Sequence, residues 1–428
     1  MTKITLNHIT KIEGHARLTV AVKNGEVKTC ELASIEGARF FEGLCLGKHW
    51  ADIREITSKI CGICSCAHTI ACLKAIENAF GIQISEQSEQ LRELITIGER
   101  IRSHATHLYL LVLPDYLGYE SGVAMAGKYK KEVLMALDLV KLGNNIVETI
   151  GGKEMHPFTS VIGGFTYVPP QEKLNALRKR LEEAKPACLK TVEMFAKLKY
   201  PKFERKTEYL AMMTRNGFPL HYGNIVTSSN IDASPYEYEK FISEYITDYN
   251  HSKFAVRDGK GYMVGALARM NLAQEYLDDE CKGLIKKHKI ELPSINPFHN
   301  SICQAIELVH WTNRAIDIIK SREFKFEGLP DVKPRAGHGI SCTEAPRGML
   351  LHEYVFDEKG ICTKCNIITP TAQLLRNMED DIRGYLPGVV KRTKSKDRVN
   401  LEVEKLIRAY DPCFSCSTHF LEVDWKEE

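Results

Sequence analysis

The sequence predicts a mainly α-helical protein with a smaller β component, an α+β chain built around a bundle of long helices. Three observations lead to this prediction. Apolar residues recur every three or four positions over long stretches, which is the spacing of a core-facing helix. Apolar and polar residues alternate in the N-terminal part and again in the C-terminal half, which favours two β-hairpins. Two Cys-x-x-Cys pairs lie near opposite ends of the chain, which suggests a metal site that joins those ends.

The elements follow from these patterns in chain order. The first hairpin is expected over residues 4–32, around Asn24-Gly25, a dipeptide that favours a type I′ turn. A long helix is expected over residues 89–112, where Pro114 ends the periodic pattern. The second hairpin is expected over residues 350–368. Further helices are expected at 67–80, 130–150, 170–198, 272–287, 300–321 and 399–410.

The domain organisation is expected to be simple, because no repeat, low-complexity segment or Ser/Gly-rich linker interrupts the 428 residues. We expect a single domain over residues 1–428. Within it, residues 1–50 should be β-rich and residues 51–345 mainly helical. Residues 346–419 should hold the second hairpin, helices and the second cysteine pair, and residues 420–428 form a candidate cleavable tail.

The charge balance argues against several classes of protein. Fifty-eight basic and 55 acidic residues leave a formal charge of +3, too small an excess for nucleic-acid binding without a local basic cluster. We find no export signal and no stretch of about 18 apolar residues, so we expect a cytoplasmic protein without a membrane span. In a reducing compartment, 14 cysteines favour metal ligation over disulfides.

The two cysteine pairs are the main chemical signal. Cys61 and Cys64 precede the helix expected at 67–80, whereas Cys413 and Cys416 follow the last expected helix. Two intervening residues let both thiolates of a pair face one metal, and soft thiolates accept zinc, iron, nickel or an iron–sulfur cluster. The spacing alone leaves these alternatives open. Zinc modules place their pairs about 15–20 residues apart, so pairs at opposite ends argue against a zinc ribbon.

The residues around the pairs resemble the large subunit of nickel–iron hydrogenases. The first family signature reads Lys59-Ile60-Cys61-Gly62-Ile63-Cys64-Ser65-Cys66-Ala67-His68. The second reads Asp411-Pro412-Cys413-Phe414-Ser415-Cys416-Ser417-Thr418-His419 and is intact. Five further family-like blocks follow in the expected order: Thr10-Lys11-Ile12-Glu13-Gly14-His15, Arg39-Phe40-Phe41-Glu42, Gly151-Gly152-Lys153-Glu154-Met155-His156-Pro157, Glu344-Ala345-Pro346-Arg347-Gly348 and Thr369-Pro370-Thr371. Chance agreement of seven ordered blocks is implausible.

The resemblance implies a nickel–iron centre that cleaves or forms dihydrogen. Cys61 and Cys413 would be terminal nickel ligands, and Cys64 and Cys416 would bridge nickel to iron. The iron would also carry carbon monoxide and cyanide. Cleavage would be heterolytic, with the Cys413 thiolate as the base that takes the proton.

The resemblance also implies roles for an acid and an arginine. Glu13 would carry the proton onward from the thiolate, the alternative being a plain surface carboxylate. Arg347 would lie over the open metal position as a fixed charge, the alternative being an ordinary buried ion pair. Asp115 and Asp411 are its candidate carboxylate partners.

Three more residues would surround the centre. His68 follows Cys64 by four residues on one helix face, so it would donate a hydrogen bond to a bridging sulfur. Pro370 and Thr371 would line the cyanide side of the iron, where the hydroxyl supplies a donor.

A buried magnesium ion near the C-terminus is also implied. Its ligands would be Glu42 and His419, with a backbone carbonyl close to Ile367 as the third. In the family, a short tail after this histidine is commonly removed by a protease once nickel is inserted. We therefore expect cleavage after His419 in the active enzyme.

Some features depart from the family pattern or go beyond it. Lys59 replaces an arginine and lacks its bidentate fork, and Leu374 stands where the family often has asparagine. A third Cys-x-x-Cys, from Cys362 to Cys365, lies in the second hairpin, where two neighbouring cysteines are favoured over a separate metal or redox site. Cys66 is an extra thiol, and the other cysteines, among them Cys281, are expected to be small buried apolar residues.

Partners are implied because the chain has no second set of four cysteines for an iron–sulfur cluster. The resemblance implies an iron–sulfur small subunit, further flavin- or ferredoxin-linked subunits, a maturation protease and metallochaperones. No G-x-G-x-x-G motif opens a βαβ unit, so a nicotinamide or flavin site would belong to another chain. Two rival functions are a metal-free, quinone-reducing homologue and a structural zinc or scaffold protein. The four retained cysteines argue against the first, and Glu13, Arg347 and Asp411 together argue against the second.

Overall fold

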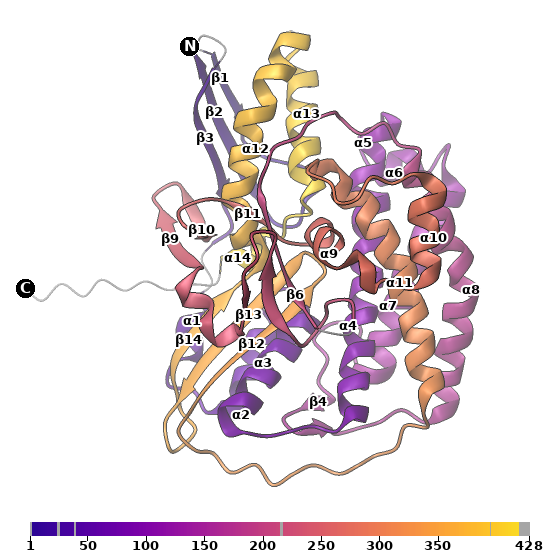
Figure 1. Ribbon diagram of the computed structural model, residues 1–428, viewed down its shortest axis with the longest axis vertical. Coiled ribbons are helices and arrows are strands. Elements are labelled where there is room, and N and C mark those ends of the chain that lie inside the picture. Colours follow the sequence, from indigo (N-terminus) through magenta and orange to yellow (C-terminus); the bar gives the residue numbers. More distant parts are fainter. Residues whose placement is uncertain (1, 24–25, 38–39, 215–216, 394, 419–428) are drawn as a thin grey trace, which may run out of the picture.

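The computed structural model describes residues 2–418, apart from 24–25, 38–39, 215–216 and 394. Long helices stand side by side on one side of the molecule, and small sheets lie on the other (Figure 1). The predicted α+β class, with a core of long helices and separate small sheets, is therefore confirmed. No helix within the described ranges combines the length and the apolar character needed to cross a membrane.

Four long helices form the bundle: α4 (Glu86–Thr106), α7 (Lys130–Gly151), α8 (Gln171–Ala196) and α11 (Asn300–Ser321). Helix α4 packs on α7 and α11, and α8 packs on α11. Helices α4 and α7 approach so closely that a Cβ atom at Gly143 would lie 2.5 Å from the carbonyl oxygen of Gly98. A side chain at this crossing would separate the two helices, so glycine is required there.

The end of α4 differs from the expectation. The helix passes through a π-helical turn (His107–Val112) into α5 (Leu113–Leu117). Pro114 lies in the first turn of α5, where its missing N–H is not needed, so the proline begins a helix instead of ending one. The helix expected at 272–287 is also divided, into α9 (Ala266–Ala273), a 3₁₀ turn (Gln274–Tyr276) and α10 (Asp279–His288).

The remaining helices carry or support the sequence motifs. They are α1 (Phe41–Cys45), α2 (Trp50–Ser58), α3 (Ser65–Phe80), α6 (Gly122–Met125), α12 (Pro370–Arg392), α13 (Lys396–Ala409) and α14 (Phe414–Ser417). Helix α12 was not among the expected helices, because Gly384 and Pro387 interrupt its pattern.

Both predicted hairpins are present, each within a three-stranded antiparallel sheet. The first sheet contains β1 (Thr2–Leu6), β2 (Ala16–Lys23) and β3 (Glu26–Ser34). The second contains β12 (Gly337–Ala345), β13 (Gly348–Phe356) and β14 (Cys362–Ile368), and α3 packs on it. The expected turn residues Asn24 and Gly25 lie outside the described residues.

The stretch from residue 208 to 263 adds strands that the sequence did not predict. A four-stranded sheet has the order β11-β6-β7-β8, and β9 pairs with β10. The bounds are β6 (Glu208–Met213), β7 (Asn224–Thr227), β8 (Asp232–Ala233), β9 (Ser243–Thr247), β10 (Asn250–Val256) and β11 (Tyr262–Met263). A further short pair is formed by β4 (Ser160–Val161) and β5 (Gly164–Phe165).

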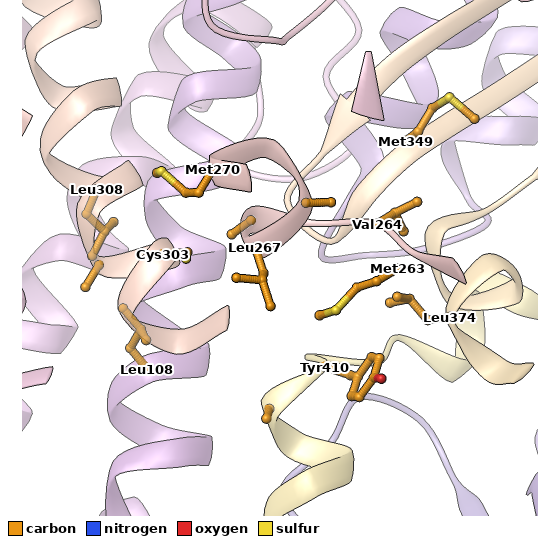
Figure 2. Close-up of a cluster of buried hydrophobic side chains, with 14 of the residues drawn as sticks. Leu108, Met263, Val264, Leu267, Met270, Cys303, Leu308, Met349, Leu374 and Tyr410 are labelled. Atoms are coloured by element: carbon orange, nitrogen blue, oxygen red, sulfur yellow. The ribbon is translucent and has the colours of Figure 1, made fainter. Parts of the chain in front are cut away.

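The main apolar core lies where the helices meet these strands. Figure 2 shows Leu267 and Met270 of α9 between the long helices and a group that contains Met263, Leu374 and Tyr410. Leu374 is only 1% exposed. The residue that replaces the family's asparagine therefore packs as an ordinary apolar side chain.

Candidate metal centre

The four cysteines of the two signatures lie together where the two ends of the chain meet. Their sulfur atoms all lie within 4.8 Å of one another, and each residue is buried. The Sγ–Sγ distance is 3.4 Å between Cys61 and Cys413, 3.0 Å between Cys64 and Cys416, and 2.8 Å between Cys413 and Cys416. The structure thus brings the two distant pairs into one cluster.

The starts of two helices place these sulfur atoms. Cys61 lies in the loop between α2 and α3, and Cys64 is the N-cap of α3. Cys413 is the N-cap of α14, and Cys416 lies within that helix. Asp411 adopts a positive φ of 53°, which turns the chain sharply between α13 and the second pair. Each pair is therefore held by a turn that leads into a helix.

The N-terminal segment closes the cluster from another side. Glu13 and Cys413 form a parallel β-bridge, and the Phe414 N–H donates to the Glu13 carbonyl oxygen at 3.1 Å. Gly14 has a φ of +80°, and a Cβ atom there would lie 3.0 Å from both the Phe414 Cβ and the Ser415 nitrogen. Glycine beside Glu13 is therefore needed for the two ends to pair.

The donor set fits a nickel–iron pair. Two thiolates about 2.3 Å from one metal, at roughly a right angle, lie about 3.3 Å apart, which is close to the observed separations. Hydrogen bonds from Cys413 and Cys416 hold the pKa of Cys61 well below its usual value. Burial raises the pKa of Cys413 and Cys416. Thiols that share protons in this way can exchange them for metal ions.

Glu13 lies at this cluster with both carboxylate oxygens engaged. One oxygen accepts the Ser415 N–H at 3.1 Å, and the other accepts the Ser415 hydroxyl. Burial, followed by the charge of the Cys61 sulfur, raises the pKa of Glu13, and the carboxylate also has a hydrogen bond with Cys413. Glu13 is therefore partly buried beside the cysteine cluster.

Arg347 occupies the two-residue turn between β12 and β13 and is 5% exposed. Its Nη2 lies 2.9 Å from Asp411 Oδ1, and its Nε donates to the Asp411 carbonyl oxygen at 2.7 Å. Burial lowers the pKa of Arg347, but the charges of Asp411 and then of the cysteine sulfurs outweigh it, so its pKa lies well above the usual value. Gln304 donates to the other Asp411 oxygen at 3.0 Å, which holds the carboxylate in place.

Asp115, the other candidate partner of Arg347, has different contacts. Arg408 Nε donates to Asp115 Oδ2 at 2.6 Å, and Lys11 pairs with Asp115 Oδ1. The π-helical turn and α5 direct this carboxylate towards α13 and the N-terminal segment. Of the two candidates, Asp411 is therefore the carboxylate that pairs with Arg347, and the expectation for Asp115 is corrected.

Of the residues expected around the iron, Thr371 contacts a cysteine of the cluster. The Thr371 hydroxyl accepts the Cys413 N–H at 2.9 Å, and Pro370 begins α12. His68 lies on α3, and its Nδ1 is 3.1 Å from His352 Nε2, an imidazole partner that was not expected. His352 in turn lies 2.7 Å from the Tyr354 hydroxyl.

The expected magnesium ligands are described in part. Glu42 Oε1 accepts the Ile367 N–H at 2.7 Å, so the structure brings these two residues together. The same oxygen accepts from Lys253 Nζ at 2.8 Å. His419 lies outside the described residues.

The residues that depart from the family pattern make ordinary structural contacts. Lys59 is exposed and pairs with Glu55 at 3.1 Å. The register of β13 with β14 shifts between Val355 and Phe356, so that Cys365 and Cys362, three residues apart, pair with Tyr354 and Phe356. Both cysteines are free thiols that pack against one apolar cluster.

Sequence reasoning missed Glu99, a buried residue of α4 that supports the first pair. Its carboxylate accepts the Cys66 N–H at 2.6 Å and the Ala67 N–H at 3.2 Å. Since Cys64 gives α3 no side-chain cap, Glu99 caps this helix from outside. Burial raises the pKa of Glu99 to about 7. No signal in the sequence separates it from the other glutamates of the same helix.

Comparisons with known proteins agree with this geometry. A family model described as nickel-dependent hydrogenase matches residues 39–133 and 232–419. The alpha subunit of sulfhydrogenase 1 of Pyrococcus furiosus is 37% identical over 420 residues, covering 97% of each chain. The alpha subunit of sulfhydrogenase 2 of the same organism is 32% identical over 424 residues and covers 98% of this chain and 100% of its own.

The solved structures show the same fold. An NAD⁺-reducing [NiFe]-hydrogenase in its H2-reduced state superposes with a TM-score of 0.87 at 21% identity, covering 98% of this chain and 100% of that chain. Structural similarity at 21% sequence identity supports only the fold. Membership of the family rests on the family model and on the relative that is 37% identical. The chain therefore belongs to the nickel-dependent hydrogenase family, as a catalytic large subunit of the nickel–iron type.

Proposed function

We propose that this chain performs reversible heterolytic cleavage of dihydrogen at a nickel–iron centre held by Cys61, Cys64, Cys413 and Cys416. One observation carries the proposal: the four buried sulfur atoms have a protonatable carboxyl, Glu13, and a fixed cation, Arg347, beside them. A structural zinc site requires only the thiolates. A metal-free, quinone-reducing homologue would require none of these groups.

The four thiolates differ in role. By the family resemblance, Cys61 and Cys413 would hold nickel alone, Cys64 and Cys416 would hold both nickel and iron, and the iron would also carry carbon monoxide and cyanide. When bound, this centre supplies the Lewis acid and the redox couple for the reaction. The chain itself supplies the base, the proton carrier and the fixed charge.

The proton route begins at Cys413 and continues through Glu13. The Cys413 sulfur takes the proton, and the neighbouring carboxylate receives it over a hydrogen bond. Ser415 holds both oxygens of Glu13, so the carboxylate cannot rotate away from the sulfur. Because burial raises the pKa of Glu13, its protonated form is more accessible than that of a surface glutamate.

Arg347 provides a positive charge that does not titrate in the working range of pH. The planar guanidinium contacts both the side chain and the carbonyl oxygen of Asp411, which fixes its plane. A flexible ammonium could not make the same set of contacts. We assign Arg347 to the open side of the metals, where it polarises dihydrogen.

Three neighbours adjust the ligands. The Thr371 hydroxyl accepts the Cys413 N–H, so its own proton can donate towards a cyanide ligand, with Pro370 beside it. We assign His68 to hydrogen bonding that tunes a bridging sulfur, with His352 fixing the ring.

A magnesium site is proposed at Glu42, His419 and a backbone carbonyl near Ile367. The contact between Glu42 and the Ile367 amide supports it, since it places a carboxylate beside this strand. The ion would share the Glu42 carboxylate with the Lys253 ammonium. Cleavage after His419 would create a terminal carboxylate near this ion. Intact-mass measurement on active protein tests this, because a fully active species that ends at Glu428 would contradict it.

The partners follow from the need to remove electrons. The alpha-subunit names of the relatives indicate that the chain works in a multi-subunit hydrogenase. We propose an iron–sulfur small subunit next to the cysteine cluster, with flavin- or ferredoxin-linked subunits beyond it, in the cytoplasm. A maturation protease and metallochaperones would serve assembly.

The test is hydrogen-dependent reduction of a viologen dye by the purified complex, with wild type compared to Cys416→Ser. The proposal predicts activity in the wild type and none in the variant. An intact, nickel-loaded complex that cannot reduce the dye with hydrogen would overturn it.

A further inference from the structure

A second group of potential metal ligands lies among the described residues, away from the four-cysteine centre. It consists of Asp278, Cys281 and His310, whose ligand atoms all lie within 4.8 Å of one another. Asp278 and Cys281 belong to the start of α10, and His310 lies on α11, which runs beside it (Figure 1). The sequence alone placed Cys281 among the apolar core residues.

The Asp278 carboxylate does more than cap a helix. Its Oδ1 accepts the Cys281 N–H at 2.8 Å, which is the ordinary N-cap contact. Its Oδ2 is not needed for the cap, yet it has three other neighbours. These are the Cys281 thiol at 3.5 Å, His310 Nδ1 at 3.1 Å and the Asn313 amide at 3.3 Å.

The distances match the edges of a tetrahedral metal site. For zinc bonds of about 2.0 Å to oxygen and nitrogen and about 2.3 Å to sulfur, the ligands would be separated by about 3.3 Å for oxygen and nitrogen and about 3.5 Å for oxygen and sulfur. The observed separations are 3.1 and 3.5 Å. An ion could therefore enter with only small side-chain movements.

The charges also suit a divalent cation. A carboxylate, a thiolate and a neutral imidazole carry two negative charges in total, which one divalent ion balances. Zinc binding would replace the proton of the Cys281 thiol and release it to solvent.

The site can be reached from outside. Of the three residues, His310 alone lines a cavity of about 590 Å³, and 30% of the Asp278 side chain is exposed to solvent. Cys281 is fully buried and approaches the site from the core side. Glu280 shares the Asn313 amide with Asp278 and would be a candidate fourth ligand.

We propose that Asp278, Cys281 and His310 bind one zinc ion that joins α10 to α11. The mixed oxygen, sulfur and nitrogen donors and the tetrahedral spacing favour zinc over magnesium or calcium. Helix α11 also carries Gln304, which holds Asp411. The ion would therefore stiffen the helix that supports the arginine partner.

The test measures zinc and nickel in the complete complex of wild type and variants by mass spectrometry. Asp278→Asn is the key variant, because asparagine caps a helix as well as aspartate but is a poor zinc ligand. Cys281→Ser keeps a hydroxyl donor, and Cys188→Ser, at a buried thiol that contacts Thr312, is the matched control. The nickel content verifies that each complex is folded and loaded, so this result is separate from the proposed function.

The expected result is one zinc per nickel in the wild type and in Cys188→Ser, and a loss of that zinc in Asp278→Asn and Cys281→Ser with nickel retained. Added zinc should raise the Tm of zinc-depleted wild type but not of Asp278→Asn. No zinc in the wild type and no response of its Tm to added zinc would overturn the proposal. Equal zinc in all four proteins would also overturn it.

Discussion

Glu13 and Cys413 pair through their backbones as a parallel β-bridge, so the N-terminal segment of the chain lies directly against the second cysteine pair. The Glu13 side chain is then held by Ser415, two residues beyond Cys413. One contact between distant segments thus places the proposed proton carrier beside the proposed base. It depends on the whole fold bringing the two ends together.

The first prediction concerns this contact. Glu13→Gln keeps the volume and the Ser415 contacts but cannot carry a proton, so hydrogen oxidation with a dye should slow by about 10²–10⁴ if proton transfer becomes limiting. The nickel content should stay at the wild-type level. Glu36→Gln, in the same segment but paired with His15 outside the centre, is the control and should leave turnover unchanged. Normal turnover in Glu13→Gln would assign the proton route to another residue.

The second prediction concerns the shape of the cation at Arg347. Lysine keeps the charge but cannot contact the Asp411 carboxylate, the Asp411 carbonyl oxygen and Ser103 at once. We expect Arg347→Lys to lower the turnover per nickel by about 10- to 100-fold, because the charge loses its fixed position. Arg314→Lys, at an exposed pair with Glu93, serves as the control. Full turnover in Arg347→Lys would show that only the charge matters.

The third prediction separates Asp115 from the chemistry. Asp115→Asn removes one of the two carboxylate partners of the buried Arg408, the other being Glu404, so the protein should lose about 2 kcal/mol of stability and show a lower Tm. The turnover per nickel should not change, since Asp115 does not pair with Arg347. A fall in turnover at an unchanged Tm would instead show that Asp115 takes part in the reaction.

The fourth prediction concerns Lys74, a buried lysine of α3 that donates to the Cys342 carbonyl oxygen at 2.9 Å. Burial lowers its pKa to about 7, from an ordinary value of 10.5. Between these values the unfolded chain binds a proton that the folded chain does not, so stability rises as the pH rises from 7 to 10.5.

Lys74→Met removes the titrating amine and therefore this pH-dependent contribution to the stability of the folded protein. The Tm of the wild type relative to Lys74→Met should therefore increase between pH 7 and pH 10, as measured by thermal unfolding. Exposed Lys59→Met is the control and should show a constant difference. A wild-type advantage that shrinks with rising pH would show that the ammonium stabilises the folded protein.

Much of the fold was readable from the sequence because the long helices bury one regular face. The apolar spacing predicted α7 and α11 with nearly their observed bounds. The strands between residues 208 and 263 were not predicted because most of them are short. A short strand contains too few residues for an alternation of apolar and polar side chains to be recognised. Helix α12 was not predicted because Pro387 and two glycines lie inside it.

The sequence predicted the residues of the candidate site that belong to short sequence motifs. The two cysteine pairs, Glu13 and Arg347 stand in such motifs, and the structure places them together. The sequence could not show whether Asp115 or Asp411 pairs with Arg347, because the position of Asp115 depends on the path of a π-helical turn. Glu99 was also missed, since a capping contact between two helices leaves no spacing in the sequence.

The most direct test of the central claim is metal analysis of the active complex combined with infrared spectroscopy. Four convergent thiolates with these neighbours should hold one nickel per chain, and bands of iron-bound cyanide and carbon monoxide should be present. Those bands should disappear in Cys64→Ser and in Cys416→Ser, where a bridging sulfur is lost. Full hydrogenase activity in a preparation that contains zinc but no nickel, and shows none of these bands, would contradict the account.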